Sequence, residues 1–299
     1  MEYNKKIQAT LAALCAQVIF GFSFMFTKIA LDFTSPLTLV ADRYIVAFLA
    51  LSIVMILSKS KIKLHKNMWK LVLMSIFQPL LYFVFESYGI QMTTSAFSSI
   101  MISMIPVVSM ISGIFILREI PSPMQYVFTA LSIGGVVIMA LAGNAQGTVT
   151  PLGILLLLGA VFSSVAYNIA SRKISAEFSA FERTYAMTII GMISFVLIAL
   201  AENIKNPIAV FAPFLSAEFT WAILFLGVFS SVVSFLFLNF ANTYLPVAKT
   251  TVFSNITTVV SVIAGAIFLK EKMSVEAILS TLMIVVGVFG VQVLGTRKC

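Results

Sequence analysis

The sequence predicts an all-α integral membrane protein in which ten transmembrane helices form two inverted five-helix repeats. Composition, hydropathy and an internal repeat support this prediction. Of the 299 residues, 60% are hydrophobic and 10% are charged, and the mean hydropathy of +1.07 lies outside the range of soluble domains. The apolar runs are continuous rather than alternating, which excludes an outer-membrane barrel.

Ten apolar runs are long enough to cross ~30 Å of hydrocarbon, which takes about 20 helical residues. In the first half they lie at 9–31, 37–57, 69–91, 95–117 and 124–142. In the second half they lie at 152–171, 182–201, 219–242, 247–269 and 275–295. A glycine-containing linker at 142–150 separates the halves, so we expect two units, 1–143 and 151–296. The polar stretch 202–218 is expected to be an external loop.

The two halves repeat each other with an offset of 152 positions. Trp69 and Trp221, the only tryptophans, mark this offset. The register then continues without a gap through Phe77/Phe229, Phe83/Phe235, Ala96/Ala248, Ser109/Ser261, Gly113/Gly265, Leu117/Leu269, Glu119/Glu271 and Gly135/Gly287. Because each copy crosses the bilayer an odd number of times, the copies must enter it from opposite sides. Inverted repeats of this kind are typical of secondary transporters.

The basic residues predict the orientation. With a cytoplasmic N-terminus, fourteen of the nineteen lysines and arginines lie inside, and Lys28, Arg43, Lys205, Lys270 and Lys272 lie outside. This bias predicts that both termini are cytoplasmic, in the inner (cytoplasmic) membrane. The basic loop from Lys59 to Lys70 follows from topology alone, so the net charge of +8 indicates no nucleic-acid partner. The first apolar run is too long for a cleaved signal, and we expect it to remain as a helix.

Features of an enzyme are absent from the sequence. It has no glycine-rich phosphate loop, and its single histidine, His65, has no cluster of cysteines or histidines to complete a metal site. We therefore expect no catalysis, no cofactor and no metal. Cys15 and Cys299 are not expected to form a disulfide.

Polar side chains in the apolar runs predict a lined pathway. In 69–91, Ser75, Gln78, Tyr82 and Glu86 recur every three or four residues, so they share one helix face. Small hydroxyl residues can also simply mediate helix packing, whereas buried amides and phenols need partners. The candidate substrate-binding residues are Gln78, Tyr82, Glu86, Ser103, Tyr167, Asn168, Asn239 and Asn255.

Three charged residues fall at similar height near the predicted outer boundary. Pairing of Glu86 with Lys28 or Arg43 would neutralise a costly charge in the membrane. Such a pair could be a structural bridge at the rim, an external gate, or a site for one end of a zwitterion. A proton-coupling role for Glu86 is not supported by a second acidic residue deep in the predicted bundle.

Several short motifs resemble the EamA-type permeases of the drug/metabolite transporter superfamily. They are Gly21-Phe22-Ser23 with Lys28, Pro36 with Arg43, Thr94-Ser95-Ala96, Pro106, Leu117-Arg118-Glu119 and Leu269-Lys270-Glu271. The resemblance covers nearly the whole chain. It implies a ten-helix metabolite carrier, usually an exporter, in which the first, third, fourth, sixth, eighth and ninth helices surround a central cavity. The fifth and tenth helices would be peripheral.

The sequence leaves the cargo open. An exporter of amino acids or related metabolites, working by alternating access, is the leading hypothesis. The 27 phenylalanines and eight tyrosines would also suit a carrier of flat or cationic drugs. In a third hypothesis the protein does not transport, but assembles or senses, and the polar stripes only hold helices together. We expect a monomer or weak homodimer in lipid. The driving force is either an ion gradient, with a proton or sodium as the coupling ion, or the substrate's own gradient, and the sequence does not decide between them.

Overall fold

The structure is a computed structural model that describes residues 2–57, 67–117, 122–145, 149–205, 207–245, 250, 253–270 and 274–293. These residues contain helices and no strand, as predicted. In the first half the helices are α1 (Glu2–Leu31), α2 (Pro36–Leu57), α3 (Trp69–Ser75), the π-helical η1 (Ile76–Leu81), α4 (Tyr82–Gln91), α5 (Ser95–Ile102), α6 (Ile105–Leu117) and α7 (Pro123–Ala145).

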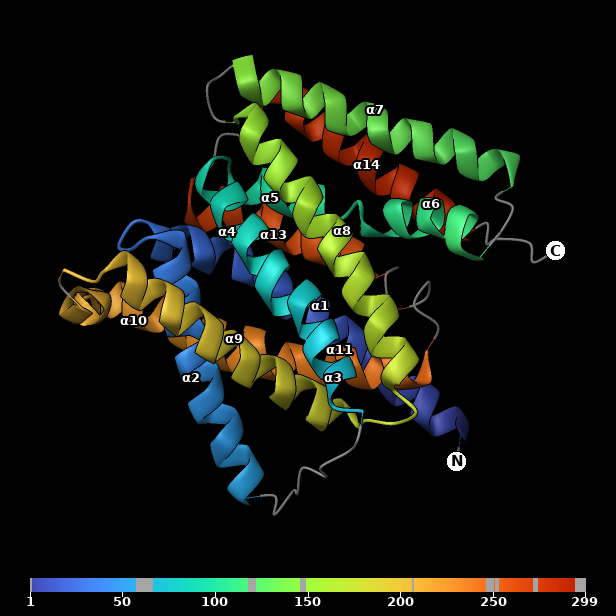
Figure 1. Cartoon of the computed structure of the whole chain (residues 1–299). Coiled ribbons are helices and arrows are strands. Elements are labelled where there is room, and N and C mark those ends of the chain that lie inside the picture. Colours follow the sequence, from blue (N-terminus) through green and yellow to red (C-terminus); the bar gives the residue numbers. More distant parts are fainter. Residues whose placement is uncertain are drawn as a thin grey trace.

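The second half contains α8 (Pro151–Ile174), α9 (Ala180–Glu202), the 3₁₀-helical η2 (Pro207–Leu215), α10 (Ala217–Leu224), the π-helical η3 (Phe225–Val233), α11 (Ser234–Tyr244), α13 (Ser254–Phe268) and α14 (Val275–Val293). The stretch predicted as a loop at 202–218 therefore holds a short 3₁₀ helix, which its apolar residues favour. In Figure 1, α1 leads away from the labelled N-terminus and α8 runs back toward that end.

Six helical rods among the described residues are long and apolar enough to cross a bilayer. They span 4–31, 36–57, 69–91, 151–174, 180–202 and 217–244. Shorter apolar helices occupy 95–109, 123–139, 256–268 and 278–290, where the sequence predicts the other four spans. Large apolar side chains such as Leu57, Trp69 and Trp221 are exposed on the outside of the bundle, where lipid would cover them. The chain is thus a multi-pass membrane protein, and a count of ten crossings stays a prediction.

Local sequence explains where the helices begin. Pro36, Pro123 and Pro151 each occupy the first helical position, where the missing N–H is not needed. Side-chain caps satisfy the first free backbone N–H groups elsewhere: Thr94 accepts from Phe97, and Ser179 forms a capping box with Glu182.

Two of the predicted spans are interrupted. Residues 69–91 form one rod, but Gln78 has an extended backbone (φ −146°, ψ 117°). Pro79 explains this break, because proline removes a helical N–H and pushes the preceding residue out of the helical region. Residues 95–117 break at 103–104 into α5 and α6, just before Pro106.

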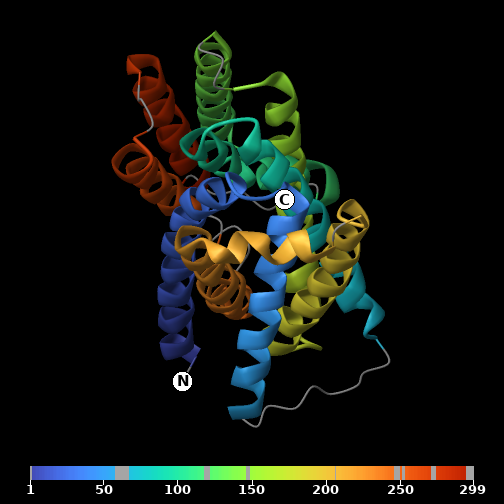
Figure 2. The same cartoon turned by 90° about the vertical axis from the view of Figure 1, so that its left-hand side faces the viewer.

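The pair α7 and α14 lies at one edge of the molecule, as both views show (Figures 1 and 2). These helices pack more extensively on each other than on any other element. Gly135 and Gly287 allow the close approach: a methyl group on Gly135 would lie 2.8 Å from Ile284 Cγ1, and one on Gly287 2.7 Å from the Phe128 carbonyl oxygen. The other helices surround the buried core.

Candidate functional site

A cavity of about 60 Å³ lies in the centre of the bundle. This volume holds several water molecules. Side chains from α1, α2, η1, α4, α5, α6, α8, α11 and α13 line it, together with residue 250. Its polar lining consists of Gln17, Ser23, Arg43, Gln78, Tyr82, Glu86, Ser164, Asn168, Thr250, Ser254 and Thr257. Its aromatic lining, apart from Tyr82, consists of Phe20, Phe24, Phe83 and Phe235.

Glu86 contributes a carboxylate to the cavity that is only partly satisfied. The residue is 4% exposed, and its Oε1 accepts a hydrogen bond of 2.9 Å from the Tyr82 hydroxyl one turn earlier in α4. Its Oε2 is buried and has no hydrogen-bond partner in the described part of the chain. A carboxylate oxygen in this state favours a ligand that donates hydrogen bonds or carries positive charge.

Arg43 supplies the opposite charge from α2. Its Nε donates to Ser231 Oγ at 2.6 Å and its Nη2 to Ser230 Oγ at 2.8 Å, and its guanidinium carbon lies 4.2 Å from the centre of the Phe83 ring. The predicted ion pair with Glu86 is thus replaced by bonds to two serine hydroxyls of η3. Arg43 and Glu86 still attract each other across the cavity. An arginine has five N–H donors, so donors remain for a ligand.

Amides complete the polar wall. Gln78 is 5% exposed, and no hydrogen bond ties its side chain to the other described residues. The break at Gln78 therefore places a free amide at the middle of a discontinuous span. Asn168 Oδ1 accepts from Asn242 Nδ2 at 3.1 Å, and Asn242 Oδ1 in turn accepts from Thr250.

Other candidate residues lie elsewhere. Ser103, Tyr167 and Asn239 are not among the described residues that line the cavity. Ser103 Oγ donates to the Ile100 carbonyl within its own turn. Tyr167 donates to Asn239 Oδ1 at 3.0 Å, inside a network discussed below. Asn255 lies in the first turn of α13, and its side chain is outside the described part of the chain.

A buried network holds α8, α9 and α11 together beside the cavity. The fully buried Arg183 donates to Ser171 and Thr243 side chains and to the Asn239 carbonyl. Asn239 Oδ1 accepts from Tyr167 and Ser171. These polar groups are therefore used for helix packing, the alternative that the sequence left open.

Two basic side chains bind the C-terminal carbonyls of helices at different ends of the bundle. Lys28 Nζ of α1 donates to the Ile90 carbonyl at 3.0 Å and the Thr93 carbonyl at 2.7 Å. Arg172 Nη1 of α8 donates to the Asn242 carbonyl at 2.8 Å and to the Thr243 carbonyl. Such cations stabilise the negative end of a helix. We call these two contacts the Lys28 latch and the Arg172 latch.

The latches lie at opposite ends of α8. The end of α4 packs on the start of α8, since Gly153 meets Thr93 and the Thr150 N–H donates to the Met92 carbonyl. Arg172 is nineteen residues beyond Gly153, which corresponds to ~28 Å of helix at ~1.5 Å per residue. Ile90 and Asn242 are equivalent in the 152-residue register.

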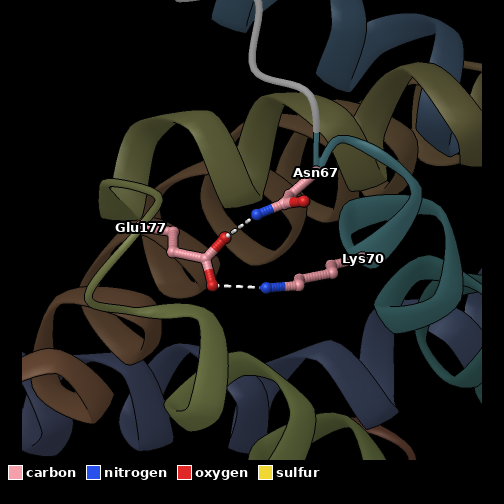
Figure 3. Close-up of polar contacts among 3 residues, drawn as sticks. All are labelled: Asn67, Lys70 and Glu177. Atoms are coloured by element: carbon pink, nitrogen blue, oxygen red, sulfur yellow. Dashed lines mark hydrogen bonds and ion pairs between the residues drawn. The ribbon is translucent and has the colours of Figure 1, made fainter.

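A polar contact joins two segments near the Arg172 end. Glu177, between α8 and α9, forms an ion pair with Lys70 and accepts from Asn67 Nδ2 at 2.9 Å (Figure 3). Lys70, Arg172 and Arg183 were all assigned to the cytoplasmic side by charge. They lie at one end of the bundle, and which side of the membrane that end faces stays a prediction.

Sequence reasoning missed several residues. Gln17 of α1 lines the cavity and its Oε1 accepts a 2.6 Å hydrogen bond from Thr257, which also lines it. Gln17 interrupts the apolar run 9–31, a signal that could have identified it. Asp42 was also missed, and it is a second acidic residue buried in the bundle, with a relative exposure of 0%.

Comparison with known proteins gives consistent matches. A family model described as the EamA-like transporter family matches residues 7–141 and again residues 151–293. The Bacillus subtilis protein named uncharacterized transporter YcxC is 31% identical over 97% of this chain and 94% of its own length. An Archaeoglobus fulgidus protein, also named an uncharacterized transporter, is 23% identical over 90% of this chain and 93% of its own. A solved crystal structure superposes with a TM-score of 0.69 at 16% identity, covering 96% of this chain and 99% of that one, which shows a shared fold.

Proposed function

The chain belongs to the EamA-like transporter family, and we propose that it is a secondary transporter that exports an amino acid or a related small metabolite across the cytoplasmic membrane. It works by alternating access, in which two inverted five-helix halves, 1–143 and 151–296, expose the central cavity to one side and then to the other. Both termini lie in the cytoplasm, and the protein acts as a monomer or weak homodimer without a cofactor.

The chemistry of the cavity supports a zwitterionic substrate. The unpaired Glu86 Oε2 suits an ammonium group, and the remaining N–H donors of Arg43 suit a carboxylate. The Gln78 amide can bind either group, and the phenylalanines of the cavity offer an apolar surface for the side chain. Arg43 would repel a ligand that carries only positive charge, so this arrangement favours amino acids over cationic drugs.

The two latches support alternating access. They lie ~28 Å apart along α8, and each ties the first helix of a copy to its third. Their acceptors Ile90 and Asn242 are equivalent in the repeat. Release of the Lys28 latch would open the cavity on one side of the membrane, and release of the Arg172 latch would open it on the other. Lys28 is thus a gating residue, and the charge bias places its end outside.

The unpaired Glu86 oxygen carries this proposal, and an efflux screen tests it. Cells loaded with labelled amino acids, nucleosides or cationic dyes should lose an amino acid faster when they express the chain than when they carry an empty vector. Glu86→Gln should remove most of this difference, because an amide cannot supply a charged acceptor to an ammonium group. Tyr82→Phe removes the only hydrogen bond that Glu86 Oε1 accepts from the described residues, and it should alter the apparent affinity more than the maximal rate.

The controls separate the alternatives. Glu218→Gln removes an exposed carboxylate that does not line the cavity and should leave efflux unchanged. Export of dyes without amino acids would favour a drug carrier. If no compound leaves faster from expressing cells than from control cells, the transport proposal is wrong and a role in assembly or sensing is favoured.

A further inference from the structure

Asp42 is a buried carboxyl group outside the lining of the central cavity. It lies in α2, its relative exposure is 0%, and neither Oδ1 nor Oδ2 has a hydrogen-bond partner in the described part of the chain. Its neighbour Arg43 does not neutralise it, because that guanidinium binds the serines of η3. Asp42 is not among the residues that line the cavity.

The helices around α2 offer Asp42 no counter-charge among the described residues. The elements packed against α2 are α1, α4, α9, α10 and η3. Their ionisable side chains include Lys28 of α1, Tyr82 and Glu86 of α4, Arg183, Tyr185 and Glu202 of α9, and Glu218 of α10, and η3 contributes none. None of these makes a hydrogen bond to Asp42. A carboxylate buried without a partner is far more costly than a neutral acid, so this packing favours protonated Asp42.

The surroundings select a proton rather than a metal ion. Sodium needs several oxygen ligands in addition to one carboxylate, as other hard cations do. In the described residues no group of three histidine, cysteine or acidic side chains could hold a metal. No described hydroxyl or amide group lies within hydrogen-bond distance of the Asp42 carboxyl either.

A second pocket ends one helical turn from Asp42. It has a volume of about 460 Å³ and is lined by residues 33–35, Thr38, Asn203, and residues 212–213. Thr38 is four residues before Asp42 and shares its helix face, which places it one turn, ~6 Å, away. Ser35 connects this pocket to an acidic residue, because its hydroxyl donates to Glu202 Oε2 at 3.0 Å. Water in the pocket thus comes within one helical turn of Asp42.

The contact between α2 and η3 links Asp42 to the cavity. Val46, four residues after Asp42 and on the same face, packs so closely on Gly227 that a methyl group there would lie 2.5 Å from Val46 Cγ1. Arg43, the next residue after Asp42, reaches the cavity and holds Ser230 and Ser231 of the same η3 segment. A shift of α2 against η3 therefore moves the cavity wall and Asp42 together.

We propose that Asp42 is the proton-binding site that couples transport to a proton gradient. In the state described here a proton occupies the Asp42 carboxyl. Water entering past Thr38 from the outer end gives this proton to the Asp42 carboxylate. When α2 shifts on η3 and the cavity opens to the cytoplasm, the carboxyl O–H bond breaks and the proton passes to water there, leaving a carboxylate. One proton thus moves inward as the substrate moves outward. This inference rests on the proposed function, and it separates the proton site at Asp42 from the substrate site at Glu86.

The test uses the full chain in proteoliposomes with a radiolabelled mixture of the protein amino acids. Exchange is measured at equal pH on both sides, and accumulation is measured with an imposed pH gradient. We expect the gradient to raise accumulation at least tenfold for the wild type and for the control Asp32→Asn, which alters an exposed acid. Asp42→Asn should lose this increase and keep its exchange rate within twofold. Glu86→Gln should lose both.

Two results would overturn the proposal while leaving transport intact. One is gradient-driven accumulation by Asp42→Asn, and the other is exchange by the wild type without any rise in its accumulation under the pH gradient. Absence of exchange by the wild type would instead contradict the proposed function. Protonation of Asp42 is then decided by infrared spectroscopy of the purified protein. The carbonyl band of a neutral carboxylic acid should persist in Glu86→Gln and disappear in Asp42→Asn. Asp42→Ala replaces the asparagine variant if that variant does not fold. Absence of this band from the wild-type spectrum refutes the proton site.

Discussion

If the two latches act as gates, removing one of them should make the cavity accessible to reagents from one side of the membrane. Replacing Arg172 by methionine removes two bonds from a cation to carbonyl oxygens at the end of α11. A charge-assisted hydrogen bond contributes ~1.5–3 kcal/mol when buried, and about 1 kcal/mol is appropriate for this exposed side chain. The loss of two bonds, about 2 kcal/mol, should raise the ratio of open to closed states roughly thirtyfold at that end.

Labelling of a single cysteine measures this ratio. Ser164 lines the cavity, so Ser164→Cys, in a chain in which Cys15 and Cys299 are replaced by alanine, reports access for a membrane-impermeant maleimide. Arg172→Met should raise the labelling rate ten- to thirtyfold in inside-out vesicles, and Lys28→Met should raise it in right-side-out vesicles. Lys173→Met, which removes an exposed charge next to Arg172, is the matched control. Equal rates in all variants, or faster labelling from the same side for both latch variants, would refute the gating assignment.

Three further predictions concern stability and are measured by thermal unfolding in detergent. Gly227→Ala should destabilise the protein by ~1–3 kcal/mol through overpacking. The control Gly134→Ala should have little effect, because its methyl group would meet only Met283 Cε at 3.7 Å. Equal melting temperatures of the two variants would contradict the tight α2–η3 contact. Arg183→Met should lower the melting temperature strongly, because it removes the cation that joins buried acceptors of α8 and α11 to α9. An unchanged melting temperature would show that the network is dispensable. Lys70→Ala should cost less than ~1 kcal/mol, since surface ion pairs contribute little, and a larger loss would mean that its contact with Glu177 is part of the stable core.

Apolar runs were enough to predict the helices, because burial in lipid requires continuous hydrophobic segments. The interruptions were harder to predict from hydropathy, because two residues such as Gln78 and Pro79 hardly change the mean hydropathy of a segment of about 20 residues. Proline chemistry would have identified this break, because Pro79 stands in the middle of 69–91.

The site was predicted in part. The three-residue and four-residue spacing of Gln78, Tyr82 and Glu86 placed them on one helix face, and the structure finds them on one cavity. Partners from other helices could not be predicted from spacing. The bonds from Arg43 to Ser230 and Ser231 join positions almost 190 residues apart. Only packing shows that Asp42, beside an arginine, has no hydrogen-bond partner among the residues described.

The contact between α7 and α14 has a consequence for biosynthesis. Each of these helices ends one half of the chain, and each covers the other through a glycine at the same register position, Gly135 or Gly287. During synthesis α7 leaves the ribosome long before α14, so the face of α7 that packs on α14 has no partner until the end of translation. The first half can therefore reach its final packing only after the last helix has been made.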